Sequence, residues 1–224
     1  MAAQATWLED AAAEWLGIRI NLTLLKHESA VRLLFEGVGY SLALVVGAML
    51  ATTAFALGLA WLMSHGPRPL RRCIGLLSML GQTSPLPLLL FFGYVVAGGI
   101  TQYSGPVALI AAVVVIGFYN GANAGRAIDD AYRVAPGRSF LGAVSAAGIQ
   151  LVAFLINATK GSPAAGMIGV PEFLNVMTDL SAYSRDRVAV YLTLLVFYTG
   201  LVLAVIALLA RLEARLAEHV QRTQ

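Results

Sequence analysis

Lys160 is the residue whose type and position most directly suggest binding chemistry. It precedes a stretch rich in glycine and proline, from Gly161 to Pro171, which lies between strongly apolar segments. Irregular backbone within a membrane is tolerated only where protein or a water-filled cavity satisfies its N–H and C=O groups, so this stretch predicts a transport path. A cation there can meet a substrate carboxylate, with Ser162 beside it. The alternative is that Lys160 only extends to the outer membrane interface.

Gln82, Thr83 and Ser84 are a second group of hydrogen-bonding side chains in an otherwise apolar run. They come directly before Pro85 and Pro87. They either line the same substrate path or satisfy the backbone groups that the two prolines leave free. The sequence leaves both interpretations open.

Catalysis by this chain is not expected. The single cysteine, Cys73, excludes an internal disulfide, and the three histidines are too scattered to suggest a metal site. The sequence contains no nucleophile elbow and no Gly-rich phosphate loop of the Walker type. We therefore expect no cofactor, no metal and no nucleic acid partner, and any ATP hydrolysis must belong to another chain.

The composition is that of a membrane protein. Hydrophobic residues make up 58% of the 224 residues and charged residues 12%, with a mean hydropathy of +0.76. About 20 apolar residues cross the hydrocarbon core, so uncharged runs predict five transmembrane helices in an all-α protein. The predicted spans lie near residues 37–64, 74–97, 107–126, 139–159 and 188–210.

The basic residues favour one orientation of these spans. If the connection at 64–73 is cytoplasmic, nine of the fifteen lysines and arginines fall on that side. This places the N-terminus outside and the C-terminus in the cytoplasm. Residues 1–32 form an N-terminal segment with an amphipathic helix expected on the outer lipid surface, 33–216 form the transmembrane domain, and 217–224 form a cytoplasmic tail.

Two further patterns concern the third predicted span and the connection after it. Gly117, Gly121 and Gly125 recur every four residues, so they share one helix face and predict close helix packing. Asp129 and Arg133 stand four residues apart, which suits either a solvated ion pair or a role in docking a partner.

Two motifs resemble those of polar amino acid ATP-binding-cassette (ABC) transporter permeases, the histidine and glutamine importer group. The segment from Lys160 to Leu174 is similar to the family's Lys-Asp-Thr-Ser-Leu-x-x-x-Ile-Gly-Val-x-Glu-Leu stretch. The matching positions are Lys160, Ile168, Gly169, Val170 and Glu172. Upstream, Ser84, Pro85, Leu86 and Tyr94 match the family's Thr-Pro-Leu element and the Tyr-containing run after it. The resemblance extends over about residues 36–216.

The resemblance implies an importer permease of the bacterial inner membrane that forms half of a translocation pathway. The implied partners are a second permease chain, alike or different, cytoplasmic ATP-binding subunits and an external solute-binding protein. The family's Glu-Ala-Ala-x-x-x-Gly loop, which docks on the ATPase, corresponds here to Asp129-Asp130-Ala131-Tyr-Arg-Val-Ala135, followed by Arg138. Because this loop departs from the family pattern, a permease-like structural or regulatory subunit that moves no solute is the alternative function.

Overall fold

The computed structural model describes residues 28–135, 137, 139–183 and 187–222. Every element in these ranges is helical, which confirms the all-α prediction. The predicted amphipathic helix near the N-terminus lies outside the described residues. The helices are α2 (Glu28–His65), α3 (Arg68–Thr83), α4 (Leu86–Ile100), α5 (Gly105–Val134), α6 (Phe140–Ala146), α7 (Gly148–Gly161), the 3-10 helix η2 (Ser162–Ile168), α8 (Phe173–Tyr183) and α9 (Arg187–Arg222).

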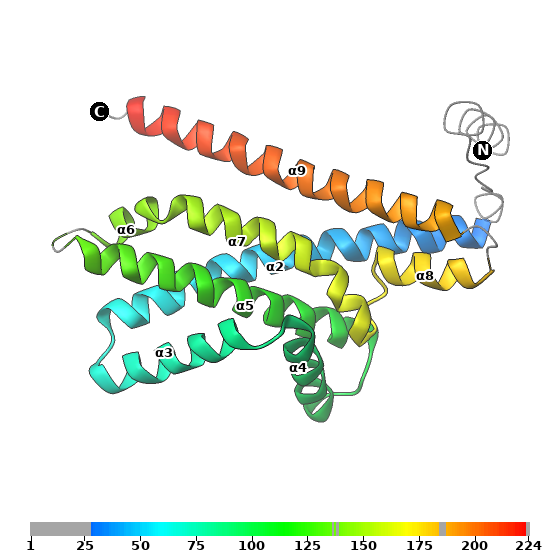
Figure 1. Ribbon diagram of the computed structural model, residues 1–224, viewed down its shortest axis with the longest axis horizontal. Helices are drawn as coiled ribbons and strands as arrows, with labels where there is room; N and C mark the ends of the chain where they lie inside the picture. The colour runs from blue at the N-terminus through cyan, green and yellow to red at the C-terminus, as the bar shows by residue number, and fades with distance from the viewer. Residues whose placement is uncertain (1–27, 136, 138, 184–186, 223–224) are drawn as a thin grey trace.

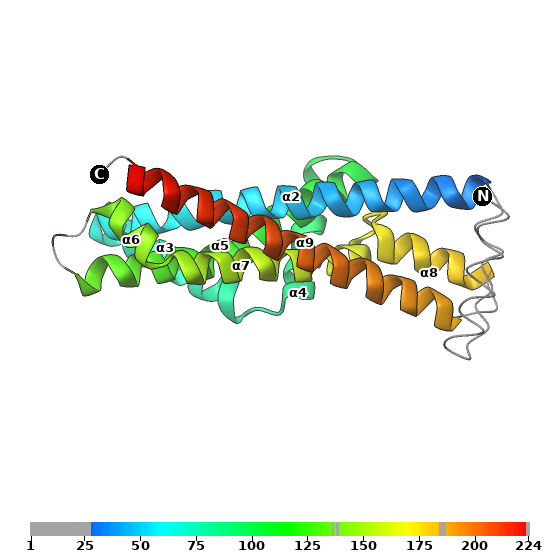
Figure 2. The same cartoon turned by 90° about the horizontal axis from the view of Figure 1, so that it is seen from above.

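The long helices lie along one axis of an elongated bundle. In Figure 1, α2, α5 and α7 follow this axis, α9 runs along the upper side of the bundle, and α4 projects to one side. Figure 2 shows α9 running obliquely across α2 and α7. The beginning of α2 and the end of α9 lie at opposite ends of the bundle (Figure 1), as an odd number of membrane crossings requires.

Within the described part of the chain, three helices are long and apolar enough to cross a membrane: Ala30–His65, Gly105–Val134 and Arg187–Leu212. Two bent helix pairs raise the number of candidate spans to five if each pair counts as one span. The five predicted runs therefore correspond to three straight helices and two broken ones. The prediction did not foresee how strongly the second and fourth runs bend.

The second predicted span, near residues 74–97, is bent by 117° between α3 and α4. Ser84 is extended, with φ −80° and ψ 138°, and Pro85 continues in an extended conformation before α4 begins. A residue that precedes proline is disfavoured in the α region, so the helix ends here. The predicted span near residues 74–97 is therefore a bent helix pair and not one straight helix.

The irregular backbone predicted for Gly161–Pro171 is much shorter in the structure. The chain stays helical from α7 through η2, and it leaves the helix at Gly169, which has φ 85°. Pro163 is tolerated because it lies in the first turn of η2, where its missing N–H costs no helical hydrogen bond. Only residues 169–172 between η2 and α8 are non-helical. The fourth predicted span breaks earlier, with a 64° bend between α6 and the helix that begins at Gly148.

The centre of the bundle is the contact between α2 and α5. A Cβ atom placed on Gly117 would lie 2.3 Å from Ala51 Cβ, and one on Gly121 would lie 2.5 Å from Phe55 Cβ. A Cβ on Gly125 would lie 2.9 Å from the carbonyl oxygen of Ala56. The glycine face of α5 therefore lies directly against the backbone of α2, the geometry in which small residues allow membrane helices to approach closely.

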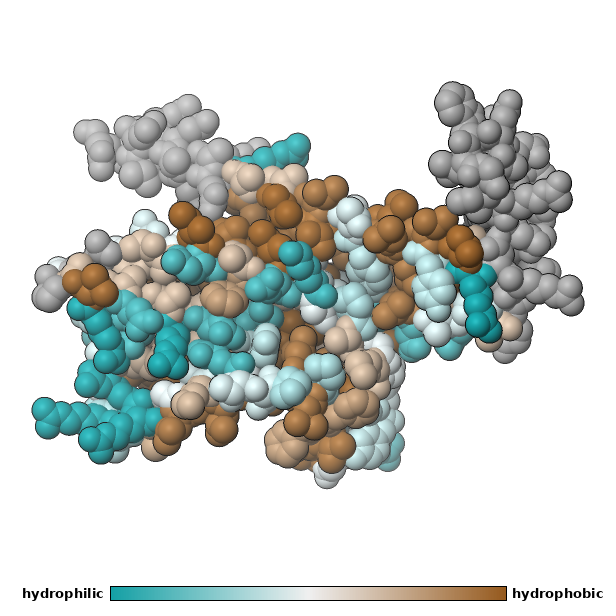
Figure 3. Space-filling model, in the orientation of Figure 1, coloured by the Kyte–Doolittle hydropathy of each residue, from teal (hydrophilic) through white to brown (hydrophobic). Residues whose placement is uncertain are grey.

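Much of the surface of the bundle is apolar. Figure 3 shows brown, hydrophobic side chains over α9 and around α4, and teal, hydrophilic side chains most densely at the end where α3 begins and α5 ends. Exposed large apolar residues occur on α2, α3, α4, α5 and α9. Such a surface is that of a membrane protein, whose apolar side chains face lipid.

Candidate functional site

Lys160 lies at the C-terminal end of α7 beside α9. It is exposed and lines a groove of about 310 Å³ together with Thr159, Pro163, Tyr198, Thr199, Val202 and Leu203. Within the described ranges it forms no ion pair. The ammonium group is therefore free to meet an anion at the surface of the bundle.

Ser162 lies close to Lys160 in sequence but is turned inward. Its side chain is buried, and its hydroxyl donates to the carbonyl oxygen of Thr159 at 2.9 Å. Thr159 is buried too, and its hydroxyl donates to the Leu155 carbonyl at 3.2 Å. Both hydroxyls thus hydrogen-bond to the backbone of their own helical segment.

The three polar residues at the α3–α4 bend have different environments. Gln82 donates from Nε2 to the Ala122 carbonyl of α5 at 3.3 Å, which links α3 to α5. Thr83 is exposed and donates to the Met79 carbonyl at 3.0 Å. Ser84 lines an apolar cavity of about 320 Å³ between α3, α4 and α5. Gln82 and Thr83 therefore donate to the carbonyls of Ala122 and Met79. Neither is a carbonyl that the prolines leave free, because proline removes the hydrogen bond to the residue four positions earlier, which is Gly81 for Pro85 and Thr83 for Pro87.

The start of α4 lies against the segment that follows Lys160. A Cβ atom on Gly161 would lie 3.2 Å from Leu86 Cδ2. Leu86 begins α4 two residues after Ser84, and Gly161 directly follows Lys160. The cavity at Ser84 and the groove at Lys160 share no lining residue. The structure therefore brings both candidate segments to one region without forming a single closed pocket from them.

A buried carboxylate organises the non-helical segment after η2. Glu172 is only 1% exposed and stands directly before α8. Its carboxylate accepts from the backbone N–H of Leu174 at 2.9 Å and of Asn175 at 3.0 Å. These are the second and third N–H groups of α8, so Glu172 caps that helix.

Two hydroxyls from other helices complete the Glu172 site. Tyr198 of α9 donates to Glu172, and Ser41 of α2 donates to it at 3.4 Å. Ser41 in turn accepts from the Phe173 N–H at 3.0 Å. This cluster ties α2, α8 and α9 together. The sequence analysis named Glu172 only as a motif position. Its occurrence as a single acid among apolar residues was the signal that could have predicted this buried cluster.

The predicted docking residues at the end of α5 divide into buried and accessible positions. Asp129 is 4% exposed; it accepts from Ser64 of α2 at 3.0 Å and from Arg133 at 2.8 Å. The ion pair suggested by the spacing therefore forms, with Arg133 57% exposed and the Asp129 side chain buried, and Asp129 is not a free docking group. Asp130 is exposed, Ala131 and Ala135 are half-buried, and Arg138 lies outside the described residues.

Exposed apolar side chains surround α6 at the same end of the bundle. Leu141 on α6 is 78% exposed, while Val134 at the end of α5 and Ile149 near the start of α7 are each 83% exposed. The first turn of α6 is capped by Ser139, whose Oγ accepts from the Gly142 N–H at 3.1 Å. The sequence analysis did not single out these three residues, because Val134 occupies an unspecified position of the loop motif and Leu141 and Ile149 follow the motif.

The comparisons with known proteins bear on the fold. No protein-family model matches the chain, and no curated relative matches it. A chain in a solved structure described as the crystal structure of an amino acid ABC transporter with histidines superposes with a TM-score of 0.67. The two are 16% identical, and the match covers 88% of this chain and 100% of the other. This protein therefore has the fold of a membrane chain from an amino acid ABC transporter.

Proposed function

We propose that the protein is the permease subunit of a binding-protein-dependent ABC importer for polar amino acids. The fold similarity carries this proposal, because it extends over the whole of the other chain at a TM-score of 0.67. The motif residues support it from the sequence: Lys160, Ile168, Gly169, Val170 and Glu172 stand in the order of the permease family. No catalytic step is assigned to this chain.

The proposed path runs along the surface that contains Lys160 and the α3–α4 bend. The ammonium of Lys160 binds the substrate carboxylate, and Ser84 borders the region from the side of α4. Gln82, Thr83 and Ser162 hold the surrounding backbone, since their hydrogen bonds go to carbonyl oxygens. Transport then follows from rocking of the helix bundles about this region, with the Gly161 to Pro171 segment as its lining.

A second permease chain completes the path in this proposal. Lys160 is exposed and its groove is open on one side, so a substrate bound there would face lipid unless another subunit covers it. An external solute-binding protein delivers the substrate. The partner is either a second copy or a different permease.

The end of the bundle that contains α6 is the proposed cytoplasmic end in a bacterial inner membrane. Arg68, Arg71, Arg72, Arg126 and Arg133 lie at this end, as the preference of cytoplasmic loops for positive charge requires. The last turn of α5 and the short helix α6 dock on the ATP-binding subunit. Asp130, Ala131, Ala135 and the exposed Leu141 form this docking surface.

Purification from membranes followed by transport measurements tests the function. We expect ATP-binding subunits and a second permease chain to copurify with the protein, and the complex in vesicles to take up polar amino acids only with ATP. A chain that copurifies without an ATPase and gives no uptake would be the structural or regulatory subunit instead. Uptake that follows an ion gradient and ignores ATP would contradict both functions.

Lys160→Ala is expected to lower kcat/KM for uptake at least ten-fold, because a hydrogen bond to a charged group contributes about 1.5–3 kcal/mol. Its abundance in the membrane should not change, since the side chain is exposed and makes no ion pair within the described ranges. Initial uptake rates in vesicles measure the effect, with Lys160→Arg as the control that keeps the charge. Wild-type rates in the alanine variant would remove Lys160 from the path.

Leu141→Asp is expected to abolish copurification of the ATP-binding subunits, because it places a charge in the centre of an apolar contact. The side chain is 78% exposed, so the fold of the chain itself should tolerate the change. Leu141→Met, which keeps the surface apolar, is the matched control and should retain the ATPase. Equal ATPase recovery with both variants would place the docking surface elsewhere.

A further inference from the structure

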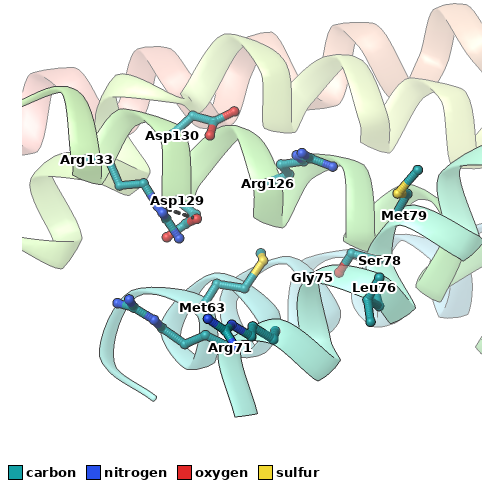
Figure 4. Close-up of a pocket in the computed structure, with 11 residues that line it drawn as sticks. Met63, Arg71, Gly75, Leu76, Ser78, Met79, Arg126, Asp129, Asp130 and Arg133 are labelled. Carbon is teal, nitrogen blue, oxygen red and sulfur yellow. Dashed lines mark hydrogen bonds and ion pairs between the residues drawn. The ribbon is translucent and has the colours of Figure 1, made fainter. Parts of the chain in front are cut away.

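A cleft between α3 and α5 lies at the arginine-rich end of the bundle. It has a volume of about 530 Å³ and belongs to neither candidate transport surface. Figure 4 shows Arg126, Asp129 and Arg133 of α5 across the opening from Arg71 and Ser78 of α3. Its lining residues are Met63, Arg71, Arg72, Gly75, Leu76, Ser78, Met79, Arg126, Asp129, Asp130 and Arg133.

The charges around the cleft do not balance. Four arginines and two aspartates line it, so the formal sum is 4 − 2 = +2. Asp129 is already occupied by Arg133 and Ser64. Among the described residues, Arg71, Arg72 and Arg126 make no ion pair. The guanidinium groups therefore come from two helices and face one opening without internal partners, an arrangement that favours an anion.

A buried hydroxyl in the cleft also lacks a partner. Ser78 is 1% exposed, and its Oγ atom has no hydrogen-bond partner among the residues that the structure describes. Serines within helices commonly donate to a carbonyl of the preceding turn, as Thr83 and Thr159 do here. An unpaired buried hydroxyl is costly, and a ligand oxygen in the cleft would satisfy it.

The same cleft has an apolar side. Met63 is buried, whereas Leu76 and Met79 are 64% and 53% exposed. A small soluble anion would leave these side chains in contact with water. A lipid whose phosphate meets the arginines and whose glycerol and first methylene groups cover Leu76 and Met79 satisfies both sides of the cleft.

We propose that this cleft binds the phosphate of an anionic phospholipid from the cytoplasmic leaflet. The inference rests on the proposed function only for the orientation that places this end in the cytoplasm. Arg71 and Arg126 bind the phosphate from opposite walls, Ser78 donates to one of its oxygens, and Arg72 and Arg133 add positive charge around the same phosphate. Juxtamembrane arginines are attracted to anionic lipids in the same way.

Lipid titrations followed by native mass spectrometry test the site on the purified full-length chain, with any subunits that copurify. The probes are phosphatidylglycerol, zwitterionic phosphatidylcholine and inorganic phosphate. We expect phosphatidylglycerol to bind at least ten-fold more tightly than phosphatidylcholine. Arg71→Gln together with Arg126→Gln should remove that preference. Arg187→Gln together with Arg211→Gln, an equal charge change at exposed residues outside the cleft, should leave it intact.

A second pair of variants tests the volume of the cleft without changing its charge. A Cβ atom on Gly75 or on Gly58 would meet nothing within 4 Å, but only Gly75 lines the cleft. Gly75→Leu should therefore weaken phosphatidylglycerol binding at least ten-fold by filling the cleft, while Gly58→Leu should not.

Retention of the preference for phosphatidylglycerol in both the arginine double variant and Gly75→Leu would overturn the proposal. Inorganic phosphate that binds as tightly as phosphatidylglycerol would identify a site for soluble anions instead. The assay measures lipid binding and requires no transport. A protein that is not an importer would therefore still give a clear result for the lipid site.

Discussion

Glu172→Ala is expected to lower the free energy of unfolding by about 3 kcal/mol. The change removes the acceptor for two N–H groups of α8 and for the hydroxyls of Tyr198 and Ser41. Each buried donor left without a partner costs about 1–3 kcal/mol, and loss of a helix cap costs about 1 kcal/mol. The two N–H groups count once, as the lost cap of about 1 kcal/mol, because the Tyr198 hydroxyl remains 3.3 Å from the Leu174 nitrogen as an alternative acceptor. With about 1 kcal/mol for each of the two hydroxyls, the sum is about 3 kcal/mol.

Thermal and denaturant unfolding in detergent measure this effect. Glu172→Gln keeps one carbonyl oxygen in the same place, so we expect it to lose roughly 1 kcal/mol. Glu36→Ala removes an acid whose ion pair with Arg32 is exposed, and it should change stability by less than about 0.5 kcal/mol. If Glu172→Ala unfolds at the same midpoint as Glu36→Ala, the Glu172 carboxylate does not stabilise the packing of α8 against α2 and α9.

The second large effect is expected for Gly121→Leu, at the contact between α5 and α2. A Cβ at this position would lie 2.5 Å from Phe55 Cβ, 2.8 Å from the Thr52 carbonyl oxygen and 3.1 Å from the Ala56 N. Two of these atoms belong to the backbone of α2, so no side-chain rotation relieves the overlap. Overpacking of this kind costs about 1–3 kcal/mol where side chains can move, and we expect at least about 3 kcal/mol here.

The yield of monodisperse protein after solubilisation, together with its unfolding midpoint, measures the effect of Gly121→Leu. Gly58→Leu is the matched control, because Gly58 lies on α2, is exposed, and has nothing within 4 Å of a Cβ. The control should be as stable as the wild type. A Gly121→Leu protein that unfolds like the control would show that α2 and α5 are not in contact along the glycine face.

Local sequence patterns predicted the features that depend on neighbouring residues in the chain. The length of the uncharged runs identified the apolar helices, because crossing a hydrocarbon core requires a fixed number of apolar residues. The spacing of Gly117, Gly121 and Gly125 placed all three on one face of α5, since the period of a helix is fixed. The pairing of Asp129 with Arg133 also followed from their separation of four residues.

The bends show where such patterns are insufficient. Pro85 and Pro87 predict that a helix ends near them. The 117° angle between α3 and α4, however, depends on the elements against which α4 packs, including η2 and α5. Pro163 gave the opposite error, because proline at the start of a 3-10 helix does not interrupt the chain. The same residue type therefore breaks or begins a helix according to its position in the turn.

The sequence by itself determined that this protein is an all-helical membrane chain, because hydrophobic run length and helical period are properties of consecutive residues. Only the tertiary structure decided which polar groups are free and which are occupied. Ser41 and Glu172 are 131 positions apart, yet they share one buried cluster. Asp129 accepts a hydrogen bond from Ser64, 65 positions away, whereas Arg71 and Arg126 line an open cleft. Burial and hydrogen bonding between distant helices arise from packing, which no local pattern encodes.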